Sequence, residues 1–265
     1  MKILSLLVAL LVSHHGSDLA RLRQYGWLLA GPQRISQRGP DWLPAMTLLA
    51  ISLVVGMLAT WLAAELAGLF GLLLLGIVTV LYTLGPRDLD RDIQMASGDE
   101  QSKARQVALE HLLLNSASGG SQAAAAALQA ALARWFGIIL WFVVLGVPGC
   151  LLYRGVREAF HSSGLAGRER AWMAQLLRIL NWPVMLLLTL ALALMTDFDR
   201  VRAAFQARED RWQFPAALLD DLAGALCDPD ESLEQGLADG RQLAWRVLGL
   251  WLAVLGLLLL AGLLS

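Results

Sequence analysis

The chain has 265 residues, of which 57% are hydrophobic and 16% are charged, and its mean hydropathy is +0.57. Soluble domains average roughly 45–50% apolar and about 25% charged residues, so this composition excludes an ordinary water-soluble domain. The net charge of −1 provides no basic field for nucleic acid, and two cysteines are too few for a disulfide framework.

Residues 1–41 are predicted to hold an interfacial helix followed by a loop. Lys2 and the apolar run 3–12 resemble the start of a signal peptide, but no small-residue cleavage pattern follows, so we expect the segment to be retained. The ten apolar residues are too few to cross a bilayer, which takes about 20. The helix is therefore expected to lie in the membrane interface or to pack on the other helices.

Five stretches without a charged residue are the candidate membrane segments. A helix rises about 1.5 Å per residue, so about 20 apolar residues cross the roughly 30 Å of hydrocarbon. The third and fourth stretches are near the lower limit and contain Pro148 and Pro183, so each is a full span, a tilted one or a re-entrant hairpin. The stretches are 42–64, 66–85, 135–153, 179–196 and 247–265.

The first two stretches predict a helical hairpin over residues 42–85, turned near Glu65. Its second arm contains three glycines that allow close backbone approach to other helices, Gly68, Gly71 and Gly76. Residues 13–41 contain four Lys or Arg and residues 86–134 contain five, so both flanks of the hairpin are expected to be cytoplasmic.

The side of the later loops depends on the third stretch. Residues 154–178 carry five arginines, and they lie outside if the third and fourth stretches both cross the membrane, against the positive-inside rule. A re-entrant third stretch moves these arginines inside and places the acidic residues 197–242 outside. The two arrangements are left open.

The polar regions are predicted to be helical as well. Residues 86–134 are expected to form cytoplasmic amphipathic helices, interrupted near Gly98, with an Ala-rich helix over 122–133 that runs into the third stretch. The acidic loop 196–242 is expected to hold two or three short helices. The inner face of residues 88–114 is assigned to Leu89, Ile93, Ala96, Ala104, Val107, Ala108, His111 and Leu112.

These elements predict an all-α fold, a polytopic helical membrane bundle with about four to five membrane segments plus amphipathic cytoplasmic and interfacial helices. A single domain is expected over residues 1–265. Its central membrane segments occupy residues 135–195, and its last span occupies residues 243–265.

The sequence contains no motif for nucleotide, dinucleotide or zinc binding, and we predict no catalytic residue, metal site or cofactor. Asp88, Asp90 and Asp92 are interpreted as an anionic helix start rather than a magnesium site, because residues two apart on a helix do not face each other. No charge is expected inside a long span, which disfavours a transporter.

A series of short motifs resembles the AmpE family of inner-membrane proteins. The series runs from LYTLGPRDLDRDI (81–93) through Gly98-Asp99 and Ala104-Arg105 to WFVVLGVPGCLLYR (141–154), LNWP (180–183) and a closing pattern over 246–251. The resemblance covers most of the chain. It implies a multi-pass protein of the bacterial inner membrane, a non-catalytic sensor, signalling or scaffold protein linked to β-lactamase regulation, antibiotic resistance and peptidoglycan recycling.

The AmpE family is similar in turn to the CobD/CbiB cobinamide-phosphate synthases, so the alternative is a divergent enzyme of that type. The chain keeps Gly98-Asp99 and Ala104-Arg105 but lacks the Glu-Asn pair before the central span, the Thr-Leu-Asp after it and the arginine that follows Pro183. A ligase acting on phosphorylated substrates needs carboxylates for a metal and fixed cations for phosphate, so the sensor or scaffold is preferred.

A ligand site, if present, is expected at the cytoplasmic mouth, because guanidinium groups suit carboxylate or phosphate. The alternative is that these residues anchor lipid phosphate or pair locally. The expected partners are the lipid bilayer and a soluble cytoplasmic protein or a cell-wall fragment, with the oligomeric state left open. The candidate ligand-binding residues are Arg87, Asp88, Asp99, Arg105 and Arg154.

Overall fold

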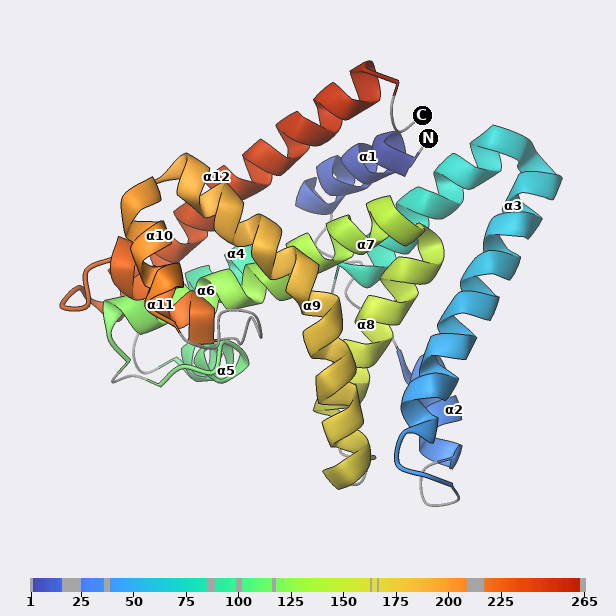
Figure 1. The fold of residues 1–265 in the computed structure, drawn as a ribbon, viewed down its shortest axis with the longest axis horizontal. Coiled ribbons are helices and arrows are strands. Elements are labelled where there is room, and N and C mark those ends of the chain that lie inside the picture. Colours follow the sequence, from blue (N-terminus) through green and yellow to red (C-terminus); the bar gives the residue numbers. More distant parts are fainter. Residues whose placement is uncertain are drawn as a thin grey trace. The chain divides into compact units, whose positions relative to one another are not determined.

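The computed structural model of the chain shows helices as the regular structure of the residues that it describes (Figure 1). The described residues are 2–15, 25–35, 39–84, 89–98, 102–115, 118–162, 164–165, 167–208 and 217–262. The helices are α1 (Lys2–His15), α2 (Gly26–Ile35), α3 (Leu43–Thr83), α4 (Leu89–Ala96), α5 (Lys103–His111), α6 (Gly120–Ala131), the π-helix η2 (Leu132–Phe136), α7 (Gly137–Leu145), α8 (Val147–His161), α9 (Gly167–Met195), α10 (Phe198–Gln206), α11 (Ala217–Leu226) and α12 (Leu233–Leu260).

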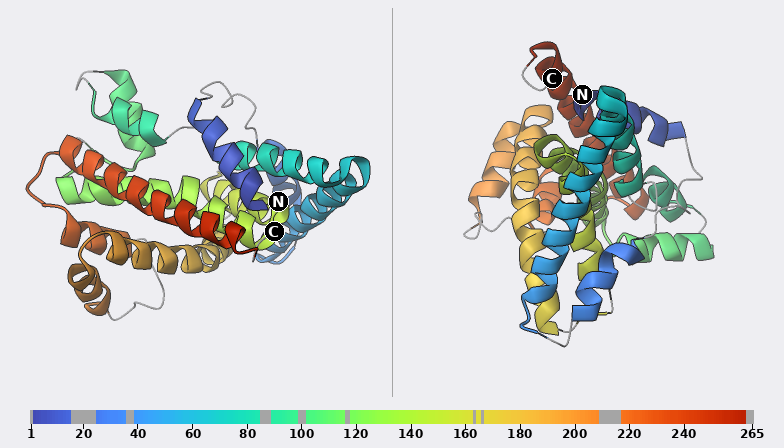
Figure 2. Two further views of the ribbon diagram at one scale, coloured as in Figure 1. Left: turned by 90° about the horizontal axis from the view of Figure 1, so that it is seen from above. Right: turned by 90° about the vertical axis from the view of Figure 1, so that its right-hand side faces the viewer.

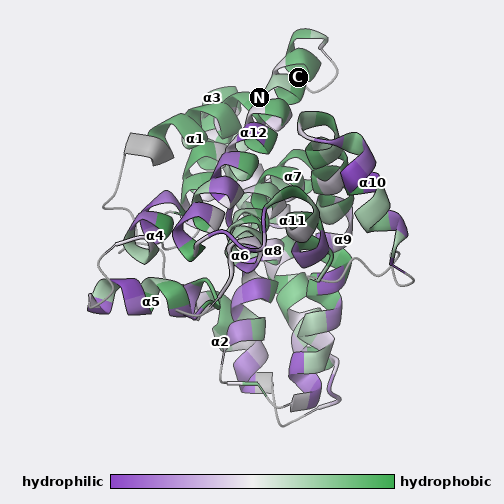
Figure 3. Ribbon diagram, turned by 90° about the vertical axis from the view of Figure 1, so that its left-hand side faces the viewer, coloured by the Kyte–Doolittle hydropathy of each residue, from purple (hydrophilic) through white to green (hydrophobic). Residues whose placement is uncertain are grey.

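Four of these helical segments are long and apolar enough to cross a membrane, which confirms the all-α membrane fold. They are α3, the continuous run Gly120–Leu145 through α6, η2 and α7, then α9 and α12. Figure 3 shows α3 and α12 mostly in the hydrophobic colour, whereas α5 is largely hydrophilic. The chain is a helical membrane protein.

The chain forms two compact units, which are described separately. The first unit contains residues 1–86, 137–181 and 255–265, and the second contains residues 87–136 and 182–254. Helices α9 and α12 each contribute residues to both units.

In the first unit, α3 is bent into two arms at Gly68 (Figures 1 and 2). The turn falls three residues after Glu65, at a glycine with φ 55° and ψ −135°, a conformation that L-residues with side chains rarely adopt. No atom lies within 4 Å of the position that a Cβ on Gly68 would take. The glycine is therefore required by the backbone conformation of the turn and not by close packing. By contrast, a Cβ on Gly71 would overlap the Ala63 carbonyl, and one on Gly76 would lie 2.8 Å from the Ser5 Cβ.

The third apolar stretch does not run straight through residues 135–153. Helix α7 ends at Leu145, Gly146 takes φ 72°, and α8 begins at Val147 with Pro148 in its first turn. The stretch is therefore a helix, a turn and a second helix, and α8 packs closely on α3. A Cβ on Gly56 of α3 would lie 2.6 Å from the Pro148 Cα.

The N-terminal helix α1 packs on the other helices of the first unit, which is one of the two placements expected for it. It contacts α3 and α7. Ile3, Leu6 and Ala9, three and then three residues apart, are buried, as one face of a helix requires.

In the second unit, α12 lies directly on α6 through glycines. A Cβ on Gly236 would lie 2.6 Å from the Gly120 Cα, and one on Gly240 would lie 2.8 Å from the Ala124 Cα. Each helix thus presents two small residues four apart, the spacing that lets membrane helices approach backbone to backbone. Ala123, Ala124 and Ala127 of α6 are fully buried.

Two spans begin earlier than the charge-free stretches indicated. Helix α9 starts at Gly167 and continues through Pro183, so residues 179–196 form only its second half. Helix α12 starts at Leu233, ahead of the charge-free residues 247–265. Both early segments carry charged residues, which membrane helices accommodate where those residues face protein or the polar boundary.

The predicted interruption of residues 88–114 is present between α4 and α5, but the assignment of the inner face was partly wrong. Leu89, Ile93 and Ala96 of α4 are buried, as are Ala108 and Leu112. Helix α5 exposes the other three, Ala104, Val107 and His111. The break between α4 and α5 shifts the helical phase, so one periodicity cannot describe both helices.

Replacing Gly236 by Ala is expected to lower the thermal unfolding midpoint in detergent. The added methyl must displace the α6 backbone, and overpacking of this kind costs about 1–3 kcal/mol. Gly249→Ala is the control in the same helix, because a Cβ there meets nothing and alanine favours helix by about 1 kcal/mol. Equal midpoints for the two variants would contradict the α6–α12 contact.

Candidate functional site

The first turn of α4 directs two carboxylates to different partners in the second unit. Asp90 accepts a hydrogen bond from Arg241 Nε at 2.5 Å and another from Trp245 Nε1 at 3.1 Å, both from α12. Asp92 pairs with Arg134 of η2, with 2.7 Å between Oδ2 and NH1. The two aspartates are spaced two apart and diverge, as helical geometry requires.

The Asp92–Arg134 pair is buried. Their side chains are 3% and 13% exposed, so both charges are largely removed from water. Arg134 belongs to a π-helical turn, a widening of the helix that is often found at functional sites. It is also the one charged residue between Gly120 and Leu145, in a helix long enough to span the membrane.

Aromatic rings join η2 to α12 beside these charges. Trp135 meets Trp245 edge-on with 5.3 Å between ring centroids, and Phe136 meets Trp251 at 5.1 Å. Trp245 therefore both donates to Asp90 and packs on the residue next to Arg134. We define the α4 clamp as Asp90, Asp92, Arg134, Arg241 and Trp245.

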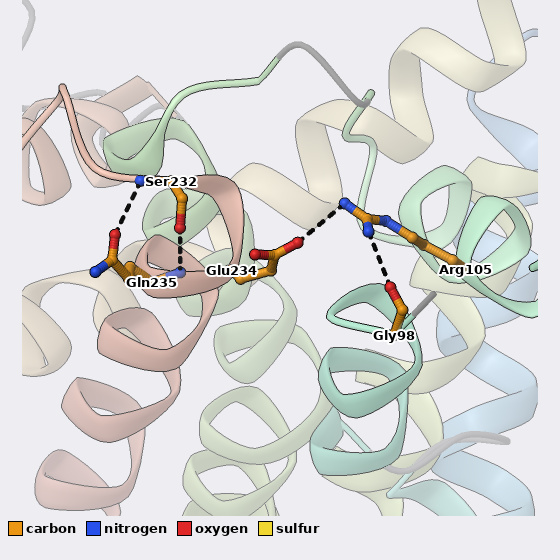
Figure 4. Close-up of polar contacts among 5 residues, drawn as sticks. All are labelled: Gly98, Arg105, Ser232, Glu234 and Gln235. Carbon is orange, nitrogen blue, oxygen red and sulfur yellow. Dashed lines mark hydrogen bonds and ion pairs between the residues drawn. The ribbon is translucent and has the colours of Figure 1, made fainter. Parts of the chain in front are cut away.

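Arg105 forms a second link, between α4, α5 and α12 (Figure 4). Its NH1 donates to the Gly98 carbonyl at 2.9 Å, and its NH2 pairs with Glu234 Oε1 at 3.3 Å. The Arg105 side chain is buried. This guanidinium therefore binds a backbone carbonyl two residues beyond α4 and a carboxylate of α12 at once.

The start of α12 places Glu234 for this contact. Gln235 N donates to Ser232 Oγ at 3.2 Å, and Ser232 N donates to the Gln235 side chain at 3.2 Å (Figure 4). This reciprocal arrangement is a capping box, which fixes where a helix begins. Glu234 lies in the first turn, where the positive end of the helix dipole stabilises a carboxylate.

The first unit holds its own buried arginine, Arg154 of α8. Its guanidinium carbon lies 4.7 Å from the centroid of the Tyr25 ring, and its NH2 pairs with Glu158. The Tyr25 hydroxyl donates to the Tyr82 carbonyl at 2.6 Å, which fixes the ring beneath the cation. At 5% exposure, Arg154 is held by the protein itself.

Nearby cations also act on the end of α8. Burial lowers the pKa of His161, and the positive charges of Arg157 and Arg154 lower it further, while Glu158 acts in the opposite direction. His161 is therefore neutral over a wider pH range than a solvated histidine. The C-terminal half of α8 is a cationic segment shielded by one carboxylate.

The structure describes two of the five predicted ligand-binding residues. Arg105 lies in the second unit and Arg154 in the first, and each is buried against its own partners. Arg87, Asp88 and Asp99 lie outside the described residues. The site thus stays a prediction for those three positions, while the guanidinium groups of Arg105 and Arg154 already have protein partners.

Sequence reasoning missed Arg134, Arg241 and Glu234. The interpretation of Asp90 and Asp92 as no more than an anionic helix start was incomplete, because each pairs with an arginine. The expectation that no charge lies inside a long span was wrong at Arg134, because the helix begins at Gly120 rather than at Trp135. An isolated arginine in an apolar helix is a signal that could have identified the clamp.

Of the two ion pairs in the α4 clamp, Asp92–Arg134 is desolvated, whereas the Arg241 side chain of the other pair is 41% exposed. Desolvated pairs contribute little net stability over apolar residues, but removing one partner strands a buried charge and is strongly destabilising. They can fix which faces of neighbouring helices meet. Within the described ranges, no three His, Cys, Asp or Glu side chains gather closely enough to hold a metal ion.

No protein-family model matches the chain, and neither a curated protein nor a solved structure shows significant similarity to it. The fold and the paired charges therefore define the class of protein, a helical membrane protein with four candidate spans. In its second unit, the short helices α4 and α5 are joined to α12 through partly buried arginine–carboxylate pairs.

Asp92→Ala is expected to lower the free energy of unfolding in detergent by about 3–5 kcal/mol, because Arg134 is left buried without its carboxylate. The double variant Asp92→Leu with Arg134→Met should recover most of this loss. Asp41→Ala is the control, since its pair with Arg168 is solvent-exposed at 3.8 Å. A loss in Asp92→Ala no larger than in the control would contradict a desolvated pair.

Proposed function

We propose that the chain is an AmpE-like protein of the bacterial inner membrane, a non-catalytic sensor or scaffold linked to β-lactamase regulation and cell-wall recycling. The ordered series of motifs over residues 81–251 supports this proposal. In it, residues 86–119 face the cytoplasm and bind a soluble protein or a cell-wall fragment, and the candidate span Gly120–Leu145 follows them. A change at these helices reaches the membrane through α12.

The observation that carries the proposal is the attachment of α4 and α5 to a membrane helix. Arg105 of α5 reaches Glu234 at the start of α12, and Asp90 of α4 reaches Arg241 two turns later. Helix α12 then continues into the apolar residues 247–260. Movement of α4 or α5 would therefore be transmitted to a membrane span through charge-assisted hydrogen bonds, which are stronger than neutral ones.

Two residues after α5 ends, an exposed leucine in a left-handed conformation suits contact with a partner. Leu113 is 85% exposed and has φ 58°, a left-handed conformation that glycine or asparagine usually occupies. Val107 on the same helix is also exposed. Strain at an exposed apolar side chain supports a functional role, because burial within the chain does not account for it.

The alternative, a divergent cobinamide-phosphate synthase, is less well supported. Of the elements shared with those enzymes, Arg105 has both terminal nitrogens engaged, by Gly98 and by Glu234. The Arg105 side chain is also only 7% exposed, which leaves little of the guanidinium open to a phosphate. The structure therefore assigns Arg105 a role in joining helices that competes with substrate binding.

Leu113→Asp is expected to abolish the effect of the protein on β-lactamase induction without changing its amount in the membrane. The measurement is β-lactamase activity after an inducer, in a strain that lacks its own AmpE-type protein and carries this chain. Gln106→Asp, an exposed change on the same helix, is the control. A wild-type chain without effect on induction, or one that restores cobalamin synthesis in a synthase-deficient strain, would contradict the proposal.

A cysteine introduced at Ser118 is expected to resist an impermeant maleimide in intact spheroplasts and to react after permeabilisation, because residues 86–119 are cytoplasmic in this proposal. The background lacks Cys150 and Cys227, the two native thiols. Glu65→Cys, exposed near the bend of α3, should react in intact spheroplasts. The reverse pattern at the two positions would invert the topology.

A further inference from the structure

The second unit contains a polar hollow that neither the α4 clamp nor Arg105 uses. Its volume is about 310 Å³, and it lies where α9 gives way to α10, beside the end of α11 and one face of α12. Its charged lining residues are Asp197, Arg200, Asp239 and Arg246. Ligand pockets begin near this size, at roughly 300 Å³.

Two arginines line the hollow. Arg246 is exposed, and among the residues that the structure describes it has no ion-pair partner. Arg200 contacts Asp197 at 3.3 Å, but both side chains are at least half exposed. Asp197 is further occupied as the N-cap of α10, where it accepts from the backbone N–H groups of Asp199 and Arg200. The Arg246 guanidinium is thus available to an anion, and Arg200 keeps N–H donors beyond the Nε that contacts Asp197.

A carboxylate, Asp239, also lines the hollow. Glu231 and Asp228 do not line it, but Glu231 is close enough to both Asp239 and Asp228 to be affected by their charges. Burial is the main cause that raises the pKa of Glu231, and the carboxylates of Asp239 and Asp228 raise it further. Burial, together with the smaller effects of the Asp239 and Glu231 carboxylates, raises the pKa of the Cys227 thiol to about 11. Asp239 in the lining, with these carboxylates near it, therefore favours a cation in the hollow.

The hollow lies at the polar ends of two membrane helices. The charge-free residues 179–196 of α9 end at Thr196, which lines it, and the charge-free residues 247–265 begin directly after Arg246. Thr196 is thus the last residue of one apolar stretch, and Arg246 directly precedes the other. This is the depth at which lipid headgroups meet a membrane protein.

We propose that this hollow binds the headgroup of a zwitterionic aminophospholipid. The phosphate contacts Arg246 and Arg200, and the primary ammonium contacts Asp239, while the acyl chains follow the apolar faces of α9 and α12. Arginine suits phosphate through its fork of N–H donors, and an ammonium group donates hydrogen bonds to carboxylate. The pairing of charges of both signs distinguishes this site from a general anchor for anionic lipid.

The test is native mass spectrometry of the delipidated protein titrated with three phospholipids that share acyl chains. Phosphatidylethanolamine should bind most tightly. Phosphatidylglycerol lacks the ammonium, and phosphatidylcholine has a quaternary ammonium that cannot donate a hydrogen bond. Loss of one charge-assisted hydrogen bond corresponds to about tenfold in affinity, which is the preference expected.

Variants locate the site. Arg246→Gln should weaken phosphatidylethanolamine binding about tenfold, and Arg246→Lys should restore part of it. Asp239→Asn should remove the preference over phosphatidylcholine while keeping phosphate binding. The control is Arg202→Gln, an exposed arginine of α10 outside the hollow.

Three results would overturn the proposal. They are equal binding of the three lipids by the wild-type chain, equal losses in Arg246→Gln and Arg202→Gln, and full displacement of the lipid by soluble glycerophosphoethanolamine at the same concentration. The last result would make a soluble zwitterion the ligand. These measurements use no β-lactamase readout, so they stand apart from the proposed function.

Discussion

The glycine-mediated contact between α6 and α12 is the constraint on which the second unit depends. Gly236 and Gly240 let the two backbones approach more closely than side chains would allow. That approach brings Glu234 to Arg105 and brings Arg241 and Trp245 to Asp90. A hydrocarbon surrounding provides no hydrophobic drive between helices, so small residues and polar pairs must together determine how these helices meet.

The helical membrane fold could be predicted because composition and charge-free stretches indicate directly whether a segment lies in lipid or in water. Helix ends were harder to predict. Gly120 begins a span because Ala-rich α6 is apolar enough to continue through Arg134 once Asp92 neutralises that charge. The bend of α3 falls at Gly68 because a backbone conformation, rather than the charge of Glu65, decides where a helix turns.

The polar contacts were the part that sequence could not supply. Arg105 and Arg154 were predicted to bind a ligand, but each has a protein partner that is remote in sequence, with Glu234 separated from Arg105 by 129 residues. Tyr25 is likewise far from Arg154 in the sequence, because helices α2 to α7 lie between them. Such pairings depend on packing, and neither local periodicity nor motif spacing encodes them.

The burial of Asp92 with Arg134 restricts how this sequence can change over evolutionary time. Loss of either charge alone strands the other in the protein interior, whereas loss of both together is nearly neutral. Positions 92 and 134 are therefore expected to be substituted jointly among descendants of a common ancestor, both charged in some lineages and both apolar in others. Exposed pairs such as Asp41 with Arg168 carry no such restriction, and those two positions are free to drift independently.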